Sequence, residues 1–269
     1  MALATTNADG KPAIPFTEDQ KYLFDTRGWL AVPNVLTDDE VGEMREFALR
    51  LHRDREKIVE HHRSSIGGPL EALTDHPVVL GFMNEFVAHE PYGNEECYAF
   101  RCEGTFSTVR NVGFDNFRPH GGNGLGRFPG NFHTYHVGGG RANSGLTRVV
   151  WELNPVERGD GGTLFLTGSH KAAFPSPQAI QDPDCPLWDT YSCPAGSVLF
   201  FTEALCHSGA AWKNPDRERI SIFNCYNIVG GKWHKWQPHS KQLAEMPFKR
   251  QTLFRDVYCQ DNVPSPPEA

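Results

Sequence analysis

Three stretches of the chain carry residues that could hold a metal ion and an acidic co-substrate. His133-Thr134-Tyr135-His136-Val137-Gly138 is a strand-like run that ends at glycine, His207 closes a strongly apolar run, and Arg219 follows twelve residues later. Two imidazoles, usually with one carboxylate, on one face of iron(II) leave positions open for a co-substrate and O2. A buried arginine fits the far carboxylate of a keto acid through paired hydrogen bonds. The residue types therefore suggest a mononuclear iron site.

These residues fall in the part of the chain that predicts β-structure. Beyond Glu95 the hydrophobic period changes from 3.6 to 2, and Gly, Pro, Asn and Asp separate the apolar runs. Such runs with almost no helical pattern between them predict an antiparallel barrel or two facing sheets. His207 and Arg219 would then share one cavity from neighbouring strands. The runs are CYAFRC, TFSTVR, NFHTYHV, LTRVVWEL, GTLFLTG, SVLFFTEA and ISIFNCYNI.

The N-terminal third predicts helices. Thr37-Asp38-Asp39-Glu40 has the capping pattern of a helix start, and apolar residues then recur at helical spacing, so we expect a helix over about 38–54. We expect a disordered-like segment over 1–15 and a single domain over 16–269. Within that domain the helical layer covers about 16–90, the β core about 95–230, and a C-terminal lid or tail about 231–269.

Composition restricts the partners of the chain. The 269 residues include 26 Lys+Arg and 33 Asp+Glu, which give a net charge of −7, and no block of basic residues stands out. This charge pattern argues against binding nucleic acid or an anionic membrane, and favours a small-molecule substrate. No apolar run reaches the length of a membrane span, and the start lacks a signal-peptide pattern. The seven cysteines form no CxxC pair, so we expect a cytoplasmic protein; no oligomeric state is indicated.

Four segments together resemble the phytanoyl-CoA dioxygenase-like iron(II)/2-oxoglutarate oxygenases. They cover most of residues 20–227. The resemblance implies a mainly β fold with N-terminal helices, the double-stranded β-helix or cupin-like jelly roll. It also implies iron(II), 2-oxoglutarate as co-substrate, and O2. The segments are YLFDTRGWLAVPNVLTDDEVGEMREF, ELNPVERGDGGTLFLTGSHKAAFP, AGSVLFFTEALCHSGAAW and DRERISIFNCYN.

The resemblance assigns roles to individual residues. It places the distal iron ligand at His207 and the salt bridge to 2-oxoglutarate at Arg219, with Arg217 as a substitute on the same strand face. Tyr226 stands where these proteins tend to have an aromatic residue beside the co-substrate. His170 belongs to a Gly-Ser-His-Lys segment near the site, and we expect a structural role for it.

The first metal motif departs from the family pattern. The family has His-x-Asp or His-x-Glu, but no acidic residue lies between Asn131 and Arg148. His133 and His136 face opposite sides of a regular strand, so only one of them would bind the metal without a bulge. We prefer His136 as the first ligand, with His133 as the alternative.

A His-x-Gly in place of His-x-Asp resembles the iron/2-oxoglutarate halogenases, in which chloride fills the position of the missing carboxylate. Other readings stay open: a carboxylate from elsewhere, a three-histidine site with His120 or His133, or a noncatalytic jelly-roll binding protein. The leading hypothesis is oxidation, by hydroxylation, of an unactivated C–H bond in a small organic molecule, and halogenation is the alternative. The carboxylates weighed are Glu203, Asp115 and Asp160.

Overall fold

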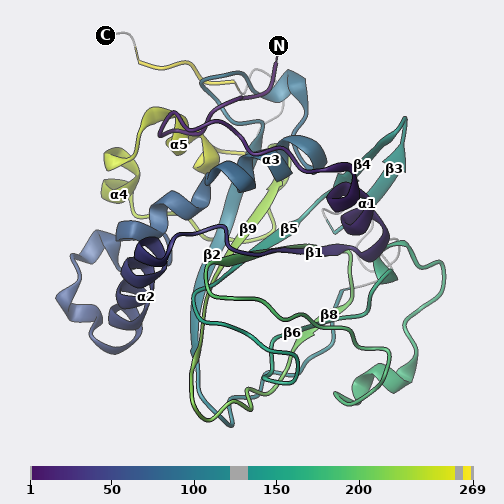
Figure 1. Cartoon of the computed structure of the whole chain (residues 1–269). Helices are drawn as coiled ribbons and strands as arrows, with labels where there is room; N and C mark the ends of the chain where they lie inside the picture. Colours follow the sequence, from purple (N-terminus) through teal and green to yellow (C-terminus); the bar gives the residue numbers. More distant parts are fainter. Residues whose placement is uncertain (1, 122–132, 258–262, 268–269) are drawn as a thin grey trace.

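A five-stranded antiparallel sheet forms the centre of this computed structural model, which describes residues 2–121, 133–257 and 263–267. Figure 1 shows the sheet between the helices and the two short strands β6 and β8. Its strand order is β1-β7-β5-β9-β2. The strands are β1 (Trp29–Val32), β2 (Phe100–Arg110), β5 (Thr147–Glu152), β7 (Ser197–Thr202) and β9 (Arg219–Ile228).

Both faces of the central sheet are covered, which explains why its inner strands are apolar at nearly every position. Val149, Trp151 and Phe200 belong to a core that the sheet shares with the helices. Val150 and Phe201 alternate with them and pack in a second core on the opposite face. Successive side chains of one strand therefore serve two different layers.

A smaller sheet closes the second face. It pairs β6 (Thr163–Phe165) with β8 (His207–Gly209), and single bridges extend it through His120 to His207 and through Asp189 to Phe165. A separate hairpin joins β3 (Tyr135–Gly138) to β4 (Arg141–Ser144). Two facing antiparallel sheets with N-terminal helices confirm the expected mainly β jelly roll.

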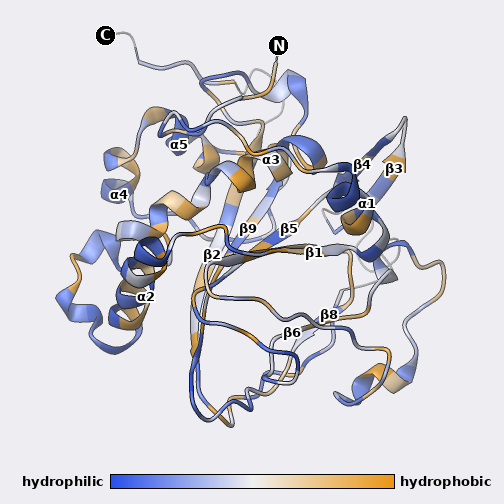
Figure 2. Cartoon of the chain, in the orientation of Figure 1, coloured by the Kyte–Doolittle hydropathy of each residue, from blue (hydrophilic) through white to orange (hydrophobic). Residues whose placement is uncertain are grey.

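Helices cover the first face of the sheet. The expected helix is α2, over Asp38–Arg53, and its capping box joins Thr37 to Glu40 as the sequence predicts. The residues of α3 are mostly apolar (Figure 2), and eight of its ten residues are buried. The helices are α1 (Glu18–Arg27), α2, α3 (Pro77–Phe86), α4 (Ser240–Glu245) and α5 (Phe248–Gln251). The 3-10 turns are Arg55–Lys57, Glu60–His62, Gly68–Thr74, Glu90–Tyr92, Ser169–Lys171, Gln178–Gln181 and Thr252–Phe254.

The first residues differ from the expected disordered segment over 1–15. Ala4 and Asn7 are buried, and Thr5 and Thr6 both hydrogen-bond to the carboxylate of Glu95. This stretch is held by polar contacts with distant residues in addition to the packing of Leu3 and Ala4 with the core. Composition alone therefore underestimated its order.

The C-terminal part is also more than a lid or tail. Met246, Leu253 and Phe254 are buried in the core beneath the helices. The six described cysteines are buried, as expected of small apolar residues. Within the described ranges, no helix has the length and apolarity needed to cross a lipid bilayer.

Candidate metal centre

Three potential metal ligands meet where the two sheets face each other. His207 begins β8, Glu203 lies in the turn after β7, and His120 forms a backbone bridge with His207. One ligand atom from each lies within 4.8 Å of the others. Glu203 and His207 are almost fully buried, whereas His120 is exposed to solvent. Two imidazoles and one carboxylate are a ligand set typical of non-haem iron(II).

The backbone fixes the orientation of both imidazoles. Nδ1 of His207 lies 2.8 Å from the carbonyl oxygen of Leu205, and Nδ1 of His120 lies 2.7 Å from that of Arg118. A carbonyl only accepts, so each Nδ1 carries a proton, and Nε2 is the nitrogen whose lone pair a neutral imidazole offers to a metal. Burial lowers the pKa of His207 to about 4, which keeps its imidazole neutral. The donor set therefore fits a metal ion.

Glu203 is held in its ionised form. Burial is the largest single effect and opposes the charge, but the charge and hydrogen bond of Arg148 and the neighbouring His207 together outweigh it and lower the pKa of Glu203 to about 2. Arg148 Nε donates to Oε1 of Glu203, while Oε2 lies 3.8 Å from Nε2 of His207. One carboxylate oxygen is thus bound by arginine, and the other faces the histidines.

A cavity of about 130 Å³ extends from the three ligands into the space between the sheets. Arg110 and Thr163 line it together with the ligands, and the rings of Phe106 and Phe223 stack at 4.4 Å between their centroids. The cavity therefore combines a metal-binding cluster, apolar walls and a cationic group. Its lining comprises Phe106, Arg110, Asn116, His120, Arg148, Thr163, Phe201, Glu203, His207, Ser208, Gly209 and Phe223.

Arg219 lies fully buried beside this cavity, but it is already paired within the chain. Its Nη2 lies 2.6 Å from Oε1 of Glu152 and 2.9 Å from the hydroxyl oxygen of Tyr191. The same Nη2 reaches Oγ1 of Thr163, a cavity residue, at 3.2 Å. Burial, reinforced by Glu152, raises the pKa of the Tyr191 hydroxyl well above its usual value. This hydroxyl therefore stays neutral and donates to Glu152.

Three of the other expected site residues, His136, Tyr226 and Arg217, lie away from this cluster. His136 is exposed on the β3–β4 hairpin. Tyr226 faces the helical layer, and its hydroxyl donates to the carbonyl oxygen of Thr74 at 2.8 Å. Arg217 precedes β9 and pairs with Asp160 at 2.8 Å. His133 is half-buried against Trp233, with ring centroids 4.6 Å apart.

The sequence predicts His120 and Glu203 only as alternative ligands. Two features of the sequence point to Glu203. It lies four residues before His207, and it lies two residues after Phe201, so strand alternation would place both side chains on the same face. The signal for His120 is weaker, because no strand pattern surrounds it. Its partner becomes clear only from the bridge to β8.

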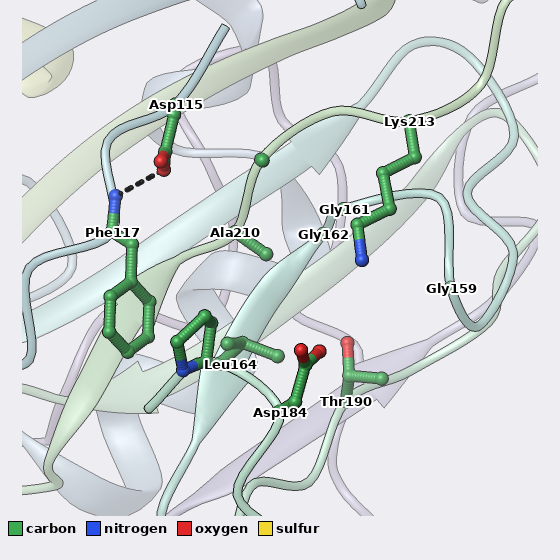
Figure 3. Close-up of a pocket in the computed structure, with 12 residues that line it drawn as sticks. Asp115, Phe117, Gly159, Gly161, Gly162, Leu164, Asp184, Thr190, Ala210 and Lys213 are labelled. Atoms are coloured by element: carbon green, nitrogen blue, oxygen red, sulfur yellow. Dashed lines mark hydrogen bonds between the residues drawn. The ribbon is translucent and has the colours of Figure 1, made fainter. Parts of the chain in front are cut away.

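Asp115, another candidate carboxylate, lines a different hollow of about 250 Å³. Figure 3 shows this hollow, with Leu164 and Ala210 on its wall and Asp115, Asp184 and Lys213 around it. Thr163 and Leu164 are neighbours on β6 and line different cavities, so this hollow adjoins the outer face of the smaller sheet. His170 is buried, and its Nε2 lies 2.9 Å from the carbonyl oxygen of Asp25.

Two further groups in the described part of the chain bring potential ligand atoms together. His61, His62 and Glu245 meet at the surface, and Glu103, Cys225 and His234 meet at the other end of Arg148. Nδ1 of His234 lies 2.7 Å from Glu103, so that carboxylate is already paired. None of these six residues is among those that line the cavity, whereas His120, Glu203 and His207 all line it.

Comparisons with known proteins agree with this architecture. The family model described as phytanoyl-CoA dioxygenase (PhyH) matches residues 24–221. HygX from Streptomyces hygroscopicus, solved with nickel and 2-oxoglutarate bound, is 22% identical with a TM-score of 0.66, covering 81% of this chain and 90% of that chain.

Two enzymes of nogalamycin biosynthesis also share the fold. The alpha ketoglutarate dependent epimerase SnoN is 18% identical with a TM-score of 0.54, covering 79% of this chain and 81% of its own. The carbocyclase SnoK is 14% identical with a TM-score of 0.57, covering 91% of this chain and 95% of its own. A search of curated protein sequences gave no match.

Proposed function

We propose that this chain, which belongs to the phytanoyl-CoA dioxygenase family, is an iron(II)- and 2-oxoglutarate-dependent oxygenase that oxidises a C–H bond of a small organic molecule. One observation carries the proposal. His120, Glu203 and His207 converge at one end of a cavity that is also lined by the buried guanidinium of Arg110. This pairing of a metal ligand set with an anion-binding group suits a keto-diacid bound to iron.

The ligand assignment changes from His136 to His120. His136 is exposed on a hairpin, whereas His120 has its Nδ1 fixed by a carbonyl and lies 4.2 Å from His207 between ring centroids. We assign His120 and His207 as the histidine ligands and Glu203 as the carboxylate. The family's His-x-Asp motif would then be His120-Gly121-Gly122, with its missing carboxylate replaced from the turn after β7.

A carboxylate in the cluster favours oxidation over halogenation. Chloride needs the coordination position that an absent carboxylate leaves open. Glu203 is ionised, nearly fully buried and directed by Arg148 toward the histidines, so it would occupy that position. The proposed outcome is therefore transfer of oxygen, as in hydroxylation.

Bound iron would supply the activation of O2 that protein side chains lack. The residues of this chain would perform the other tasks. His120, Glu203 and His207 would fix the metal on one side, and the stacked Phe106 and Phe223 would exclude water from the cavity wall. The exposed side of His120 would leave the mouth open to the organic substrate.

Anaerobic titration with Fe(II) and 2-oxoglutarate tests the proposal. We expect a weak visible charge-transfer band that appears only when both are present and that chloride does not shift. His207→Ala should abolish the band, and His136→Ala should leave it unchanged, with folding of each variant checked by circular dichroism. Absence of the band from the metal-loaded wild type would contradict the proposed function. A chloride-dependent shift would instead support a halogenase.

A further inference from the structure

Arg110, near the end of β2, is a buried cation without an ionic partner in the described part of the chain. Its side chain lines the cavity, only 4% of the residue is exposed, and its Nε has no hydrogen-bond acceptor there. The contact it does make is neutral: Nη1 donates to Oδ1 of Asn116 at 3.1 Å. Burying an unpaired charge is costly, so such a group points to an anion that binds beside it.

The charges around Arg110 leave one positive charge uncompensated. Arg110 and Arg219 are direct register partners on β2 and β9. Glu152 neutralises Arg219, and Tyr191 is neutral. Burial and then the like charge of Arg219 lower the pKa of Arg110 to about 10, which still leaves it charged at neutral pH. One monovalent carboxylate would balance this group.

Hydrogen-bond donors are also left over on the second arginine. Nη1 of Arg219 is buried and has no acceptor among the described residues, although Nε and Nη2 are both bound to Glu152. Arg219 is thus held by an internal carboxylate and retains one donor nitrogen. Arg110 retains its charge and lines the cavity itself.

We infer that Arg110 is the direct ionic partner of the co-substrate's distal carboxylate, and that Arg219 assists through its remaining Nη1. This inference rests on the proposed function and changes the role that the family resemblance gave to Arg219. It also predicts specificity for 2-oxo dicarboxylic acids, because a 2-oxo monocarboxylic acid would leave Arg110 unpaired.

The surroundings hold Arg110 in position for this role. The guanidinium lies 5.0 Å from the centroid of the Phe114 ring, and Asn116 fixes Nη1. Asn116 in turn packs against Gly209 so closely that a Cβ there would lie 2.0 Å from its Oδ1. Because Gly209 has no Cβ, it leaves room for the Asn116 amide that orients Arg110.

Calorimetric titration of the Ni(II)-loaded protein tests the inference, with 2-oxoglutarate and pyruvate as probes. Arg110→Met should weaken binding of 2-oxoglutarate by about 100-fold, because it removes one partner of a buried charge pair. It should hardly affect pyruvate, which lacks the distal carboxylate. Arg110→Lys should give an intermediate loss, since it keeps the charge but not the fork. Arg217→Met is the matched control, because Arg217 pairs with Asp160 outside the cavity.

The stability of the ligand-free protein gives an independent measure. Removal of an unpaired buried charge should leave the thermal midpoint of Arg110→Met equal to or above that of wild type, whereas a structural arginine would lower it. Equal 2-oxoglutarate affinity in wild type and Arg110→Met would overturn the inference and leave the proposed function standing. Failure of the Ni(II)-loaded wild type to bind 2-oxoglutarate at all would contradict both.

Discussion

At the scale of single residues, the site depends on how each ligand is held by its neighbour. The two imidazoles are oriented by backbone carbonyls, so their Nε2 atoms are directed by the main chain. Glu203 is oriented by a side chain, Arg148, whose Nη2 also lies 3.4 Å from Nε2 of His234. Arg148 is therefore a positioning residue for the carboxylate ligand.

Replacement of Arg148 tests this dependence. Arg148→Gln should lower the affinity for Ni(II) or Fe(II) by about 10–100-fold, the usual effect of losing a group that orients a metal ligand. Isothermal titration calorimetry measures the change. Arg158→Gln, which removes an exposed pair with Asp189, is the control and should bind metal like wild type. Wild-type affinity in Arg148→Gln would show that Glu203 does not depend on Arg148.

At the scale of elements, strand alternation determines which residues meet. Arg219 and Tyr226 lie seven positions apart on β9, so they face opposite sides of an uninterrupted strand. The sequence could have excluded Tyr226 from the site on this ground alone. The capping box of α2 is likewise a local feature that the sequence predicts well. His207, expected at the end of an apolar strand, instead begins the separate strand β8 after a turn.

Other features of the site depend on contacts that no local pattern encodes. His120 reaches His207 through a single bridge between segments far apart in the chain. Glu203 follows the last residue of β7, so its direction depends on the turn and on Arg148. The pairing of Arg219 with Glu152 depends on the register between β5 and β9, which the sequence does not specify.

The start of α3 gives a pH-dependent prediction. Nδ1 of His76 accepts a hydrogen bond from the backbone N–H of Val78, and burial lowers the pKa of His76 to about 4 although Glu40 opposes the shift. The unfolded chain takes up this proton near pH 6.5, before the folded chain does. The contribution of His76 is therefore complete above pH 6.5 and is lost as the pH falls toward 4.

Between pH 7 and pH 5 this loss should amount to about 2 kcal/mol of unfolding free energy. His76→Asn keeps a side-chain acceptor at the helix start but does not titrate. Urea unfolding at the two pH values should therefore show a smaller decrease for this variant than for wild type. If the free energy of unfolding decreased equally in both proteins, the pH dependence could not be assigned to His76.

At the scale of the whole molecule, one buried arginine joins the two ends of the chain. Arg250 in α5 pairs with Asp9 at 2.7 Å, Glu71 at 2.9 Å and Asp75 at 2.8 Å. Asp75 also accepts from the hydroxyl of Tyr98 on the segment that enters β2. The N-terminal segment, the helical layer and the C-terminal helices are thus tied together behind the sheet that carries the site.

Arg250→Ala should destabilise the protein by about 3–5 kcal/mol, because it leaves the buried carboxylate of Asp75 without its partner. The matched control is Arg50→Ala, which removes an exposed pair with Glu46 and should cost about 0.5 kcal/mol or less. Chemical denaturation measures both changes. A loss for Arg250→Ala no larger than that of the control would show that this network does not stabilise the fold.

A crystal structure with Ni(II) and 2-oxoglutarate tests the central claim most directly, because anomalous scattering locates the metal without assumptions about activity. We expect one strong peak within about 2.0–2.2 Å of Nε2 of His120, Nε2 of His207 and a carboxylate oxygen of Glu203. A peak at His133 or His136, or at Glu103, Cys225 and His234, with none at His207, would contradict it.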